Sequence, residues 1–227
     1  AIRAGARWVA RLRPYDPDPA EPGANRRLAI LERGSLGNLV RQDVPRDPPA
    51  AGEVEIRVHA TGLNFRDVLN ALGMYPGDPG PLGNECAGVV TALGEGVSGL
   101  AVGDEVVAMT DRSFATWVTV PAVMAARKPA NVDFAAAATI PVTFLTADHA
   151  LNTLGRMGPG TRVLIHAITG GVGMAALQLA RRAGAQIYGT AGTPAKRELA
   201  RSLGAHYVSD SRSLAFVEDF GRATGGR

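Results

Sequence analysis

Three glycines lie close together in the second half of the chain, at Gly170, Gly171 and Gly173. Residues 163–165 before them are β-branched or aliphatic, which is typical of a strand buried on both faces. Residues 174–180 after them place apolar side chains at helical spacing, and Gly184 predicts the end of that helix.

A strand, a glycine turn and a helix in this order form a phosphate site, because the turn's amides and the positive end of the helix dipole point at the ligand. A Cβ in the turn would hold the backbone away from a pyrophosphate. We therefore expect residues 170–173, with Val172 among them, to bind a dinucleotide cofactor. The alternative is that the glycines serve only the close packing of helix against strand.

The residues after the next strand indicate which dinucleotide this is. NAD-binding sheets carry an acidic residue about 20 positions beyond the glycines, where it binds the ribose hydroxyls. Here residues 189–193 hold no carboxylate, and the first to follow is Glu198. Lys196 and Arg212 are cations that would complement a 2′-phosphate, so the sequence favours NADPH over NADH. The alternative for both is a solvated surface side chain. We expect three further side chains in the cofactor site: Thr146, Thr190 and Ser211.

Composition excludes several other functions. The 227 residues carry 24 basic and 21 acidic side chains without a basic run, which does not indicate nucleic-acid binding. No apolar run approaches about 18 residues and no signal peptide is evident, so we expect no membrane span and a cytoplasmic protein. The single Cys86 excludes an internal disulfide and is expected to be a small core residue. The four histidines lack metal or triad spacing, and no GxSxG motif supports hydrolysis.

The chain divides into three parts by pattern. Residues 1–25 are expected to be an upstream remnant and a Pro/Asp-rich linker. Residues 26–130 contain short strands with glycine turns, which predicts a mostly β, partly closed barrel. Residues 131–227 alternate strands and helices, which predicts a parallel sheet of the α/β class. Three strands wound in this way lie in the order 3-2-1, so the strand before the glycines forms an unprotected edge. We therefore expect a nucleotide domain that is incomplete at its C-terminus.

Together these segments resemble the medium-chain dehydrogenase/reductase superfamily, in its zinc-independent branch. The likeness is greatest to the enoyl reductase domain of modular polyketide synthases or animal-type fatty acid synthases. It is carried by residues 62–77, 82–90, 103–109, 135–151, 162–181 and 209–216. The resemblance implies an N-terminal chaperonin-10-like β-barrel domain for the substrate, followed by a truncated Rossmann doubly wound sheet that binds NADPH.

The resemblance also implies a reaction. Enoyl reductases reduce the C2–C3 double bond of an α,β-unsaturated thioester on an acyl carrier protein, with hydride added to the β-carbon and a proton to the α-carbon. The other partners implied are ketoreductase and dehydratase domains of the same synthase. Tyr75 matches the proposed proton donor, and Asn64 would hydrogen-bond the nicotinamide or the substrate. A packed loop aromatic and a buried capping residue are the alternatives for these two.

Two features of the resemblance limit the expected chemistry. Zinc-dependent relatives have a Cys and a His where this chain has Asn64 and Asn84, so no metal is expected. The family's lysine and aspartate proton donors correspond to positions after Arg227, which leaves open whether this chain alone is active. Two other functions stay open: a stand-alone quinone or enone oxidoreductase, and a non-catalytic NADPH-binding or scaffold module.

Overall fold

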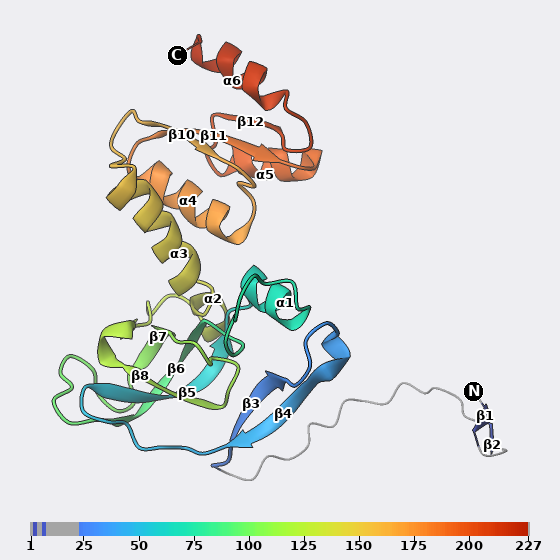
Figure 1. Cartoon of the computed structure of the whole chain (residues 1–227). Coiled ribbons are helices and arrows are strands. Elements are labelled where there is room, and N and C mark those ends of the chain that lie inside the picture. The colour runs from blue at the N-terminus through green and yellow to red at the C-terminus, as the bar shows by residue number, and fades with distance from the viewer. Residues whose placement is uncertain (1, 4–5, 8–22, 227) are drawn as a thin grey trace.

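The computed structural model describes residues 2–3, 6–7 and 23–226. The first of these form a two-stranded antiparallel pair, β1 (Ile2–Arg3) and β2 (Ala6–Arg7). Most of the expected remnant and linker, residues 1–25, lies outside the described residues. The rest of the described chain forms two lobes joined by a helix (Figure 1).

The first lobe is built of β-strands around an apolar core. Its main sheet is antiparallel with the strand order β8-β5-β6-β7-β9. The strands are β5 (Glu53–Thr61), β6 (Glu85–Leu93), β7 (Glu105–Met109), β8 (Trp117–Pro121) and β9 (Ala125–Arg127). Val54 and Ile56 alternate along β5 and are fully buried with Val90 and Val106.

A separate ribbon of two strands, β3 (Asn25–Ile30) and β4 (Leu39–Val44), lies beside this sheet. A single bridge between Arg27 and Ala115 and a hydrogen bond from Leu28 N to Phe114 O, 2.7 Å long, attach the ribbon to the segment before β8. The lobe is thus a sheet partly closed by a ribbon. Three short elements complete it: the 3₁₀ turns η1 (Leu36–Asn38) and η2 (Ala122–Met124), and the helix α1 (Phe65–Ala71).

A helical connection leads from the first lobe to the second. It consists of α2 (Phe134–Ala137), α3 (Pro141–Asp148) and the π-helical turn η3 (His149–Leu154). Pro141 separates α2 from α3 and occupies the first turn of α3. The π-helical turn was not predicted from the sequence. In Figure 1, α3 runs from the β lobe up to the helices of the second lobe.

This connection also corrects one expectation. By length and composition alone, Phe134–Leu154 is apolar enough to cross a membrane, with a mean hydropathy of 1.2. The statement that no apolar run approaches a spanning length is therefore wrong. In the structure the proline interrupts the run, and its two ends pack into different cores: Ala137 with Ala87 of the β lobe, and Ala147 with the core of the second lobe.

The second lobe is a three-stranded parallel sheet in the order β10-β11-β12. Its elements alternate along the chain: β10 (Arg162–Ile165), α4 (Gly171–Arg182), β11 (Gln186–Ala191), α5 (Pro194–Ser202), β12 (Tyr207–Asp210) and α6 (Phe216–Thr224). Figure 1 shows α4 and α5 on one side of the sheet and α6 on the other. The predicted alternation and strand order are confirmed.

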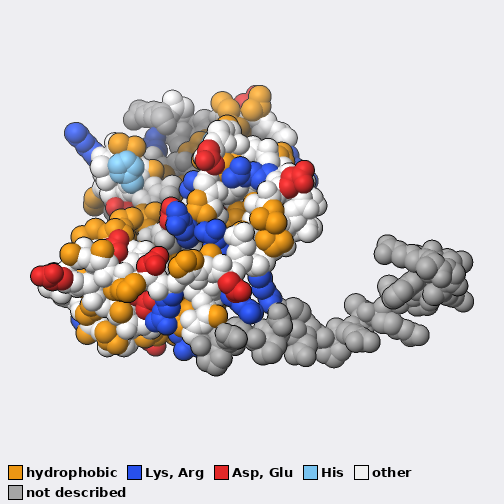
Figure 2. Space-filling model, turned by 60° about the horizontal axis from the view of Figure 1, so that its bottom comes forward, with side chains coloured by type: hydrophobic (Ala, Val, Ile, Leu, Met, Phe, Trp, Pro, Cys, Tyr) orange, Lys and Arg blue, Asp and Glu red, His pale blue; other side chains and the backbone are white. Residues whose placement is uncertain are grey.

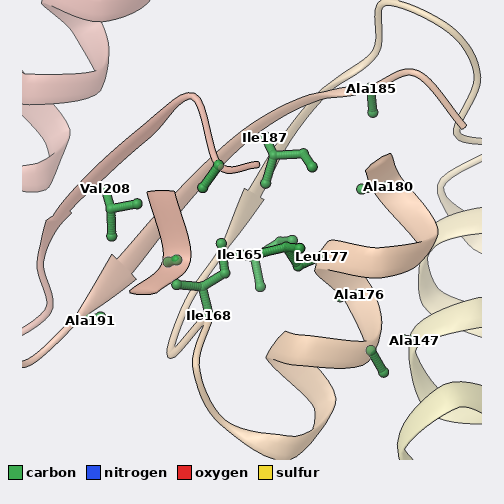
Figure 3. Packing of buried hydrophobic residues seen from close by; sticks show 13 residues of the cluster. Ala147, Ile165, Ile168, Ala176, Leu177, Ala180, Ala185, Ile187, Ala191 and Val208 are labelled. Carbon is green, nitrogen blue, oxygen red and sulfur yellow. The ribbon is translucent and has the colours of Figure 1, made fainter. Parts of the chain in front are cut away.

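The two faces of this sheet are filled differently. On the α4 side, Ile165, Ile187 and Leu177 pack together, and alanines of α4 let the helix approach the strands (Figure 3). On the α6 side, Tyr188 meets the ring of Phe220 edge-on. The sequence predicted that the strand before the glycines is buried on both faces. The structure differs, because Leu164 on this edge strand is 43% exposed.

Candidate functional site

The glycine turn lies between β10 and the start of α4, as predicted. Gly170 is the N-cap of α4, and the first helical hydrogen bond runs from Met174 N to Gly170 O at 2.8 Å. The amides of residues 171–173 therefore precede the ladder of the helix and lie at its positive end. Gly171 is exposed, and Val172 is 41% exposed. This arrangement can bind an anionic group such as a pyrophosphate.

The third glycine has a different physical reason. Gly173 is buried, and a Cβ on it would lie 2.8 Å from Ile168 Cα and closer still to the carbonyl oxygen of Ala167. Only glycine allows α4 to start this close to the preceding turn. From the sequence, we expected all three glycines to let the backbone approach the cofactor. At Gly173, close packing of α4 against the turn is enough to explain why the residue is glycine.

Thr190, at the end of β11, is hydrogen-bonded to the glycine turn. Its hydroxyl accepts a hydrogen bond from Ala167 N at 3.3 Å and lies 3.2 Å from His166 Nδ1, and its carbonyl accepts from Ile168 N at 3.0 Å. Thr190 is fully buried, and Ala167 has a positive φ of 49°. The structure thus places Thr190 under the strained turn rather than on its open side.

Cations gather where β11 and β12 end. A Cβ on Gly192 would lie 3.3 Å from Arg212 Nε and 3.4 Å from Ser211 Oγ, so the glycine lets both side chains approach the end of β11. Lys196 is exposed in the first turn of α5, where Thr193 caps its amide. The predicted pair Ser211 and Arg212 therefore adjoins the second strand, and Lys196 lies in the first turn of the helix that follows.

Arg197, which follows Lys196, is another of the cations that the sequence places just downstream of the second strand. Its guanidinium donates to Ala191 O at 3.1 Å and pairs with Asp210 at 3.3 Å, and Asp210 also accepts from Arg212 N at 2.9 Å. Asp210 ends the third strand, and Arg197 pairs with its charge. An acidic residue at the end of the third strand is a signal that the sequence offered.

The remaining predicted cofactor residue, Thr146, is exposed on α3. One turn earlier on the same helix, Thr143 Cγ2 would lie 3.2 Å from a Cβ on Gly171. The helix α3 therefore runs directly beside the glycine turn.

On the β lobe, Asn64 is the N-cap of α1 and lies in a buried polar network. The backbone N–H of Asn64 donates to Asp67 Oδ2 at 2.9 Å, and the side-chain Nδ2 of Asn64 donates to Glu85 Oε1 at 2.9 Å. The other oxygen, Glu85 Oε2, accepts from Val142 N in the first turn of α3 at 2.8 Å. Burial raises the pKa of the Glu85 carboxyl, and the hydrogen bonds from Val142 and Asn64 oppose that rise. Sequence reasoning missed Glu85, although a glutamate at the head of an apolar strand is an unusual buried charge.

Tyr75 lies beyond the other end of α1 and is half-buried. Its amide donates to Leu69 O at 3.2 Å, and the guanidinium of Arg66 lies 5.4 Å from the centre of its ring. Arg66 also donates to Pro79 O at 2.8 Å and to Asn84 Oδ1 at 2.6 Å, so it fastens the loop that carries Tyr75 to α1. Asn64 and Tyr75 thus stand at opposite ends of one short helix.

The two asparagines at the zinc positions of relatives are both engaged in hydrogen bonds. Asn84 Nδ2 donates to Asp67 Oδ1 at 3.1 Å, while Asn64 donates to Glu85. Among residues 2–3, 6–7 and 23–226, no group of three or more His, Cys, Asp or Glu side chains could hold a metal ion. Two histidines have structural contacts: His59 stacks on Phe134 with ring centres 4.4 Å apart, and His206 Nδ1 accepts from Ile187 N at 3.0 Å.

Cys86 is fully buried, and burial raises the pKa of its thiol to about 12. We therefore expect no alkylation of Cys86 by iodoacetamide in the folded protein at about pH 8, and full alkylation after unfolding in guanidinium. Mass spectrometry of the intact protein measures both. Rapid alkylation under native conditions would contradict the buried position.

Figure 2 shows basic and acidic side chains intermixed on the face that it presents, without a single-sign stripe. The surface thus gives no electrostatic footprint for nucleic acid on that face.

Comparison with known proteins agrees with both lobes. Residues 50–130 match the alcohol dehydrogenase GroES-like domain, and residues 171–227 match the zinc-binding dehydrogenase family. The chain is 42% identical over 247 residues to a phenolphthiocerol/phthiocerol polyketide synthase of Mycobacterium tuberculosis, in an alignment that covers all of this chain and 11% of that protein. It therefore spans about a tenth of the length of this relative.

Solved structures show the same likeness. The CurK enoyl reductase superimposes with a TM-score of 0.84 at 43% identity, covering 89% of this chain and 64% of that one. A quinone oxidoreductase of Escherichia coli, complexed with NADPH, superimposes with a TM-score of 0.78 at 32% identity, covering 88% of this chain and 63% of that one. The expected pairing of a GroES-like β domain with a Rossmann-like parallel sheet is confirmed.

Proposed function

The chain belongs to the medium-chain dehydrogenase/reductase superfamily, among the enoyl reductase domains of polyketide synthases, and from this membership we propose that it serves NADPH-dependent reduction of an enoyl thioester. The substrate proposed is an α,β-unsaturated acyl group on an acyl carrier protein. The observation that carries the proposal is the glycine turn, whose amides at the start of α4 lie beside α3, the helix whose first turn donates to Glu85.

The residues present fit NADPH. Gly173 keeps the turn tight against Ile168, and the amides of 171–173 can bind the pyrophosphate. Arg212, Ser211 and Lys196, near the end of β11, fit a 2′-phosphate. The likeness to a quinone oxidoreductase complexed with NADPH supports the same cofactor. We assign residues 131–227 as the cofactor domain and residues 26–130 as the substrate domain.

Each lobe then has a chemical task. When bound, NADPH supplies the hydride for the β-carbon. Asn64, fixed at the start of α1, orients the nicotinamide or the thioester, and the phenol of Tyr75 donates the proton to the α-carbon. Arg66 keeps the Tyr75 loop on α1, which holds the proton donor in place.

The proposed setting is a modular synthase in the cytoplasm. The partners proposed are the carrier protein and the ketoreductase and dehydratase domains that produce the enoyl group.

The test is an assay of the natural protein with NADPH and a crotonyl thioester, carried on pantetheine or on a carrier protein. Thioester-dependent oxidation of NADPH, followed by its absorbance, supports the proposal. Rapid reduction of quinones with no thioester reduction would favour a quinone oxidoreductase instead. A natural protein that does not bind NADPH in a fluorescence titration would favour a scaffold module.

Replacement of Tyr75 by phenylalanine should lower kcat for the thioester while leaving the Kd for NADPH unchanged. We expect a loss of about tenfold, less than the ~10²-fold typical of a sole general acid, because the resemblance implies a lysine and an aspartate as further proposed proton donors. Tyr207→Phe is the matched control, since this tyrosine lies on β12, away from α1, and packs against Phe220. Equal rates for Tyr75→Phe and the wild type would remove Tyr75 as proton donor.

A further inference from the structure

A carboxyl group is buried where the two lobes meet. Glu85 begins β6 and is 2% exposed. One oxygen accepts from the side chain of Asn64, on the β lobe, and the other accepts from Val142 N, at the start of α3. A single side chain thus joins the polar end of the substrate domain to the helix that enters the cofactor domain.

The surroundings are shaped for this carboxyl group. A Cβ on Gly62 would overlap the Glu85 carboxylate, so the neighbouring strand end leaves room for it. The N-terminus of α3 carries partial positive charge toward Oε2. Glu55, the other buried glutamate of this sheet, differs: it pairs with the cation of Arg46 at 2.6 Å and is held by Thr91. The two partners described for the Glu85 carboxylate are uncharged N–H donors, which is an expensive way to bury a carboxylate if stability were its only purpose.

The hydrogen-bond pattern fixes the orientation of Asn64. An ionised carboxylate only accepts, so the amide nitrogen of Asn64 must face Glu85. The carbonyl Oδ1 of Asn64 is then directed away from Glu85; the capping box of α1 has the Asn64 side chain accept from the backbone N–H of Asp67, and a carbonyl oxygen can accept a second hydrogen bond. A nicotinamide carboxamide carries N–H donors that such an acceptor can bind.

The hydrogen bond from Val142 N to Glu85 fixes the start of α3, the helix that leads into the cofactor domain. Val142 is followed by Thr143, whose methyl group lies beside Gly171 of the glycine turn, and Ala147 on the same helix is in the core of the second lobe. A shift of the start of α3 would therefore move the glycine turn relative to Asn64.

We propose that Glu85 is a positioning residue for hydride transfer: by accepting from Asn64 and from Val142 N it sets the amide of Asn64 and the start of α3 at one fixed separation. This inference rests on the proposed reductase function. Loss of the carboxylate should misalign the reacting groups and lower the rate of hydride transfer more than it weakens the binding of the cofactor.

The experiment compares Glu85→Gln with Glu55→Gln in the natural protein. Glu85→Gln offers an amide N–H to Asn64 and frees it to flip, so we expect the hydride-transfer rate to fall on the order of 10- to 100-fold. The Kd for NADPH should rise less than the rate falls, by about fivefold at most, which corresponds to the loss of one hydrogen bond to the nicotinamide. The isotope effect with deuterated NADPH should rise, because hydride transfer becomes more rate-limiting. Glu55→Gln is the matched control, since it removes an equally buried charge that pairs with Arg46 instead of α3, and it should lower only the melting temperature.

The double variant N64D/E85Q reverses donor and acceptor, because the introduced aspartate can only accept and the introduced glutamine supplies the amide N–H. It should recover activity relative to both single variants. The double variant also provides the test if Glu85→Gln alone does not fold. A double variant that folds but does not reduce the thioester would overturn the inference.

The outcomes separate the two proposals. A wild-type protein that reduces no thioester contradicts the proposed function. An active wild type in which Glu85→Gln and Glu55→Gln have the same rate and isotope effect overturns the role of Glu85 alone.

Discussion

Replacement of Gly173 by alanine is expected to abolish most dinucleotide binding. The added Cβ would lie 2.8 Å from Ile168 Cα and would also collide with the carbonyl of Ala167, and backbone atoms cannot move aside as a side-chain end can. Overpacking of this kind costs up to about 3 kcal/mol, which corresponds to roughly a 100-fold rise in the Kd for NADPH if the turn opens to relieve it. A fluorescence titration with NADPH and a thermal melt measure the two effects.

Gly158→Ala provides the control for this prediction. Gly158 precedes β10, and a Cβ on it would meet no atom within 4 Å. It should leave the Kd for NADPH and the melting temperature close to those of the wild type. If Gly173→Ala bound NADPH as tightly as Gly158→Ala, the tight turn would not be needed for the cofactor.

Local signals made the helices of the second lobe predictable. Thr193 as a cap, Pro194 in the first turn and Gly204 after the end predict a helix over 194–202. The structure has α5 over this range, with Thr193 accepting from Lys196 N and Gly204 at a φ of 112°. Each of these residues acts within one turn of the helix end, so adjacent sequence carries the information.

The sequence was a weaker guide where contacts between residues far apart in the chain determine the environment of a side chain. The strand at 163–165 is apolar throughout, yet Leu164 is exposed because β10 lies at the edge of the sheet among the described residues. Thr190 was expected at the cofactor, which stays a prediction; the sequence did not indicate that its hydroxyl accepts from Ala167 of the turn. Periodicity reports how a strand alternates but not which neighbour covers each side.

The polar network at the lobe junction shows the same limit more sharply. Asn64 could be selected from the sequence, but its partner Glu85 lies 21 residues away and the next partner, Val142, lies 57 residues further on. Arg66 on α1 and Arg197 on α5 likewise have partners that their neighbours in the sequence do not indicate. Here one fastens the Tyr75 loop and the other pairs with Asp210, contacts that only the folded chain reveals.

Removal of the cations at the end of β11 should change the cofactor preference more than any substitution elsewhere on the second lobe. In Arg212→Ala with Lys196→Ala, two charges expected at the 2′-phosphate are lost. Hydrogen bonds to charged groups contribute about 1.5–3 kcal/mol each, so the Kd for NADPH should rise by roughly 100-fold or more. NADH lacks the 2′-phosphate, and its Kd should be unaffected. Titrations of both cofactors by fluorescence give the ratio directly.

The expected loss of preference for NADPH in the double variant should come from charge and not from a change in the shape of the site. Two further measurements distinguish these two causes. Electrostatic attraction to a phosphate is screened by salt, so the advantage of NADPH in the wild type should shrink between low ionic strength and about 0.5 M salt, and the double variant should show little dependence. Arg182→Ala removes a cation at the opposite end of α4 from the glycine turn and should preserve the preference. Arg197 is already paired with Asp210 and cannot replace the lost charges without giving up that pair. Equal weakening of NADPH and NADH in the double variant would mean that these side chains support the sheet end and do not recognise the phosphate.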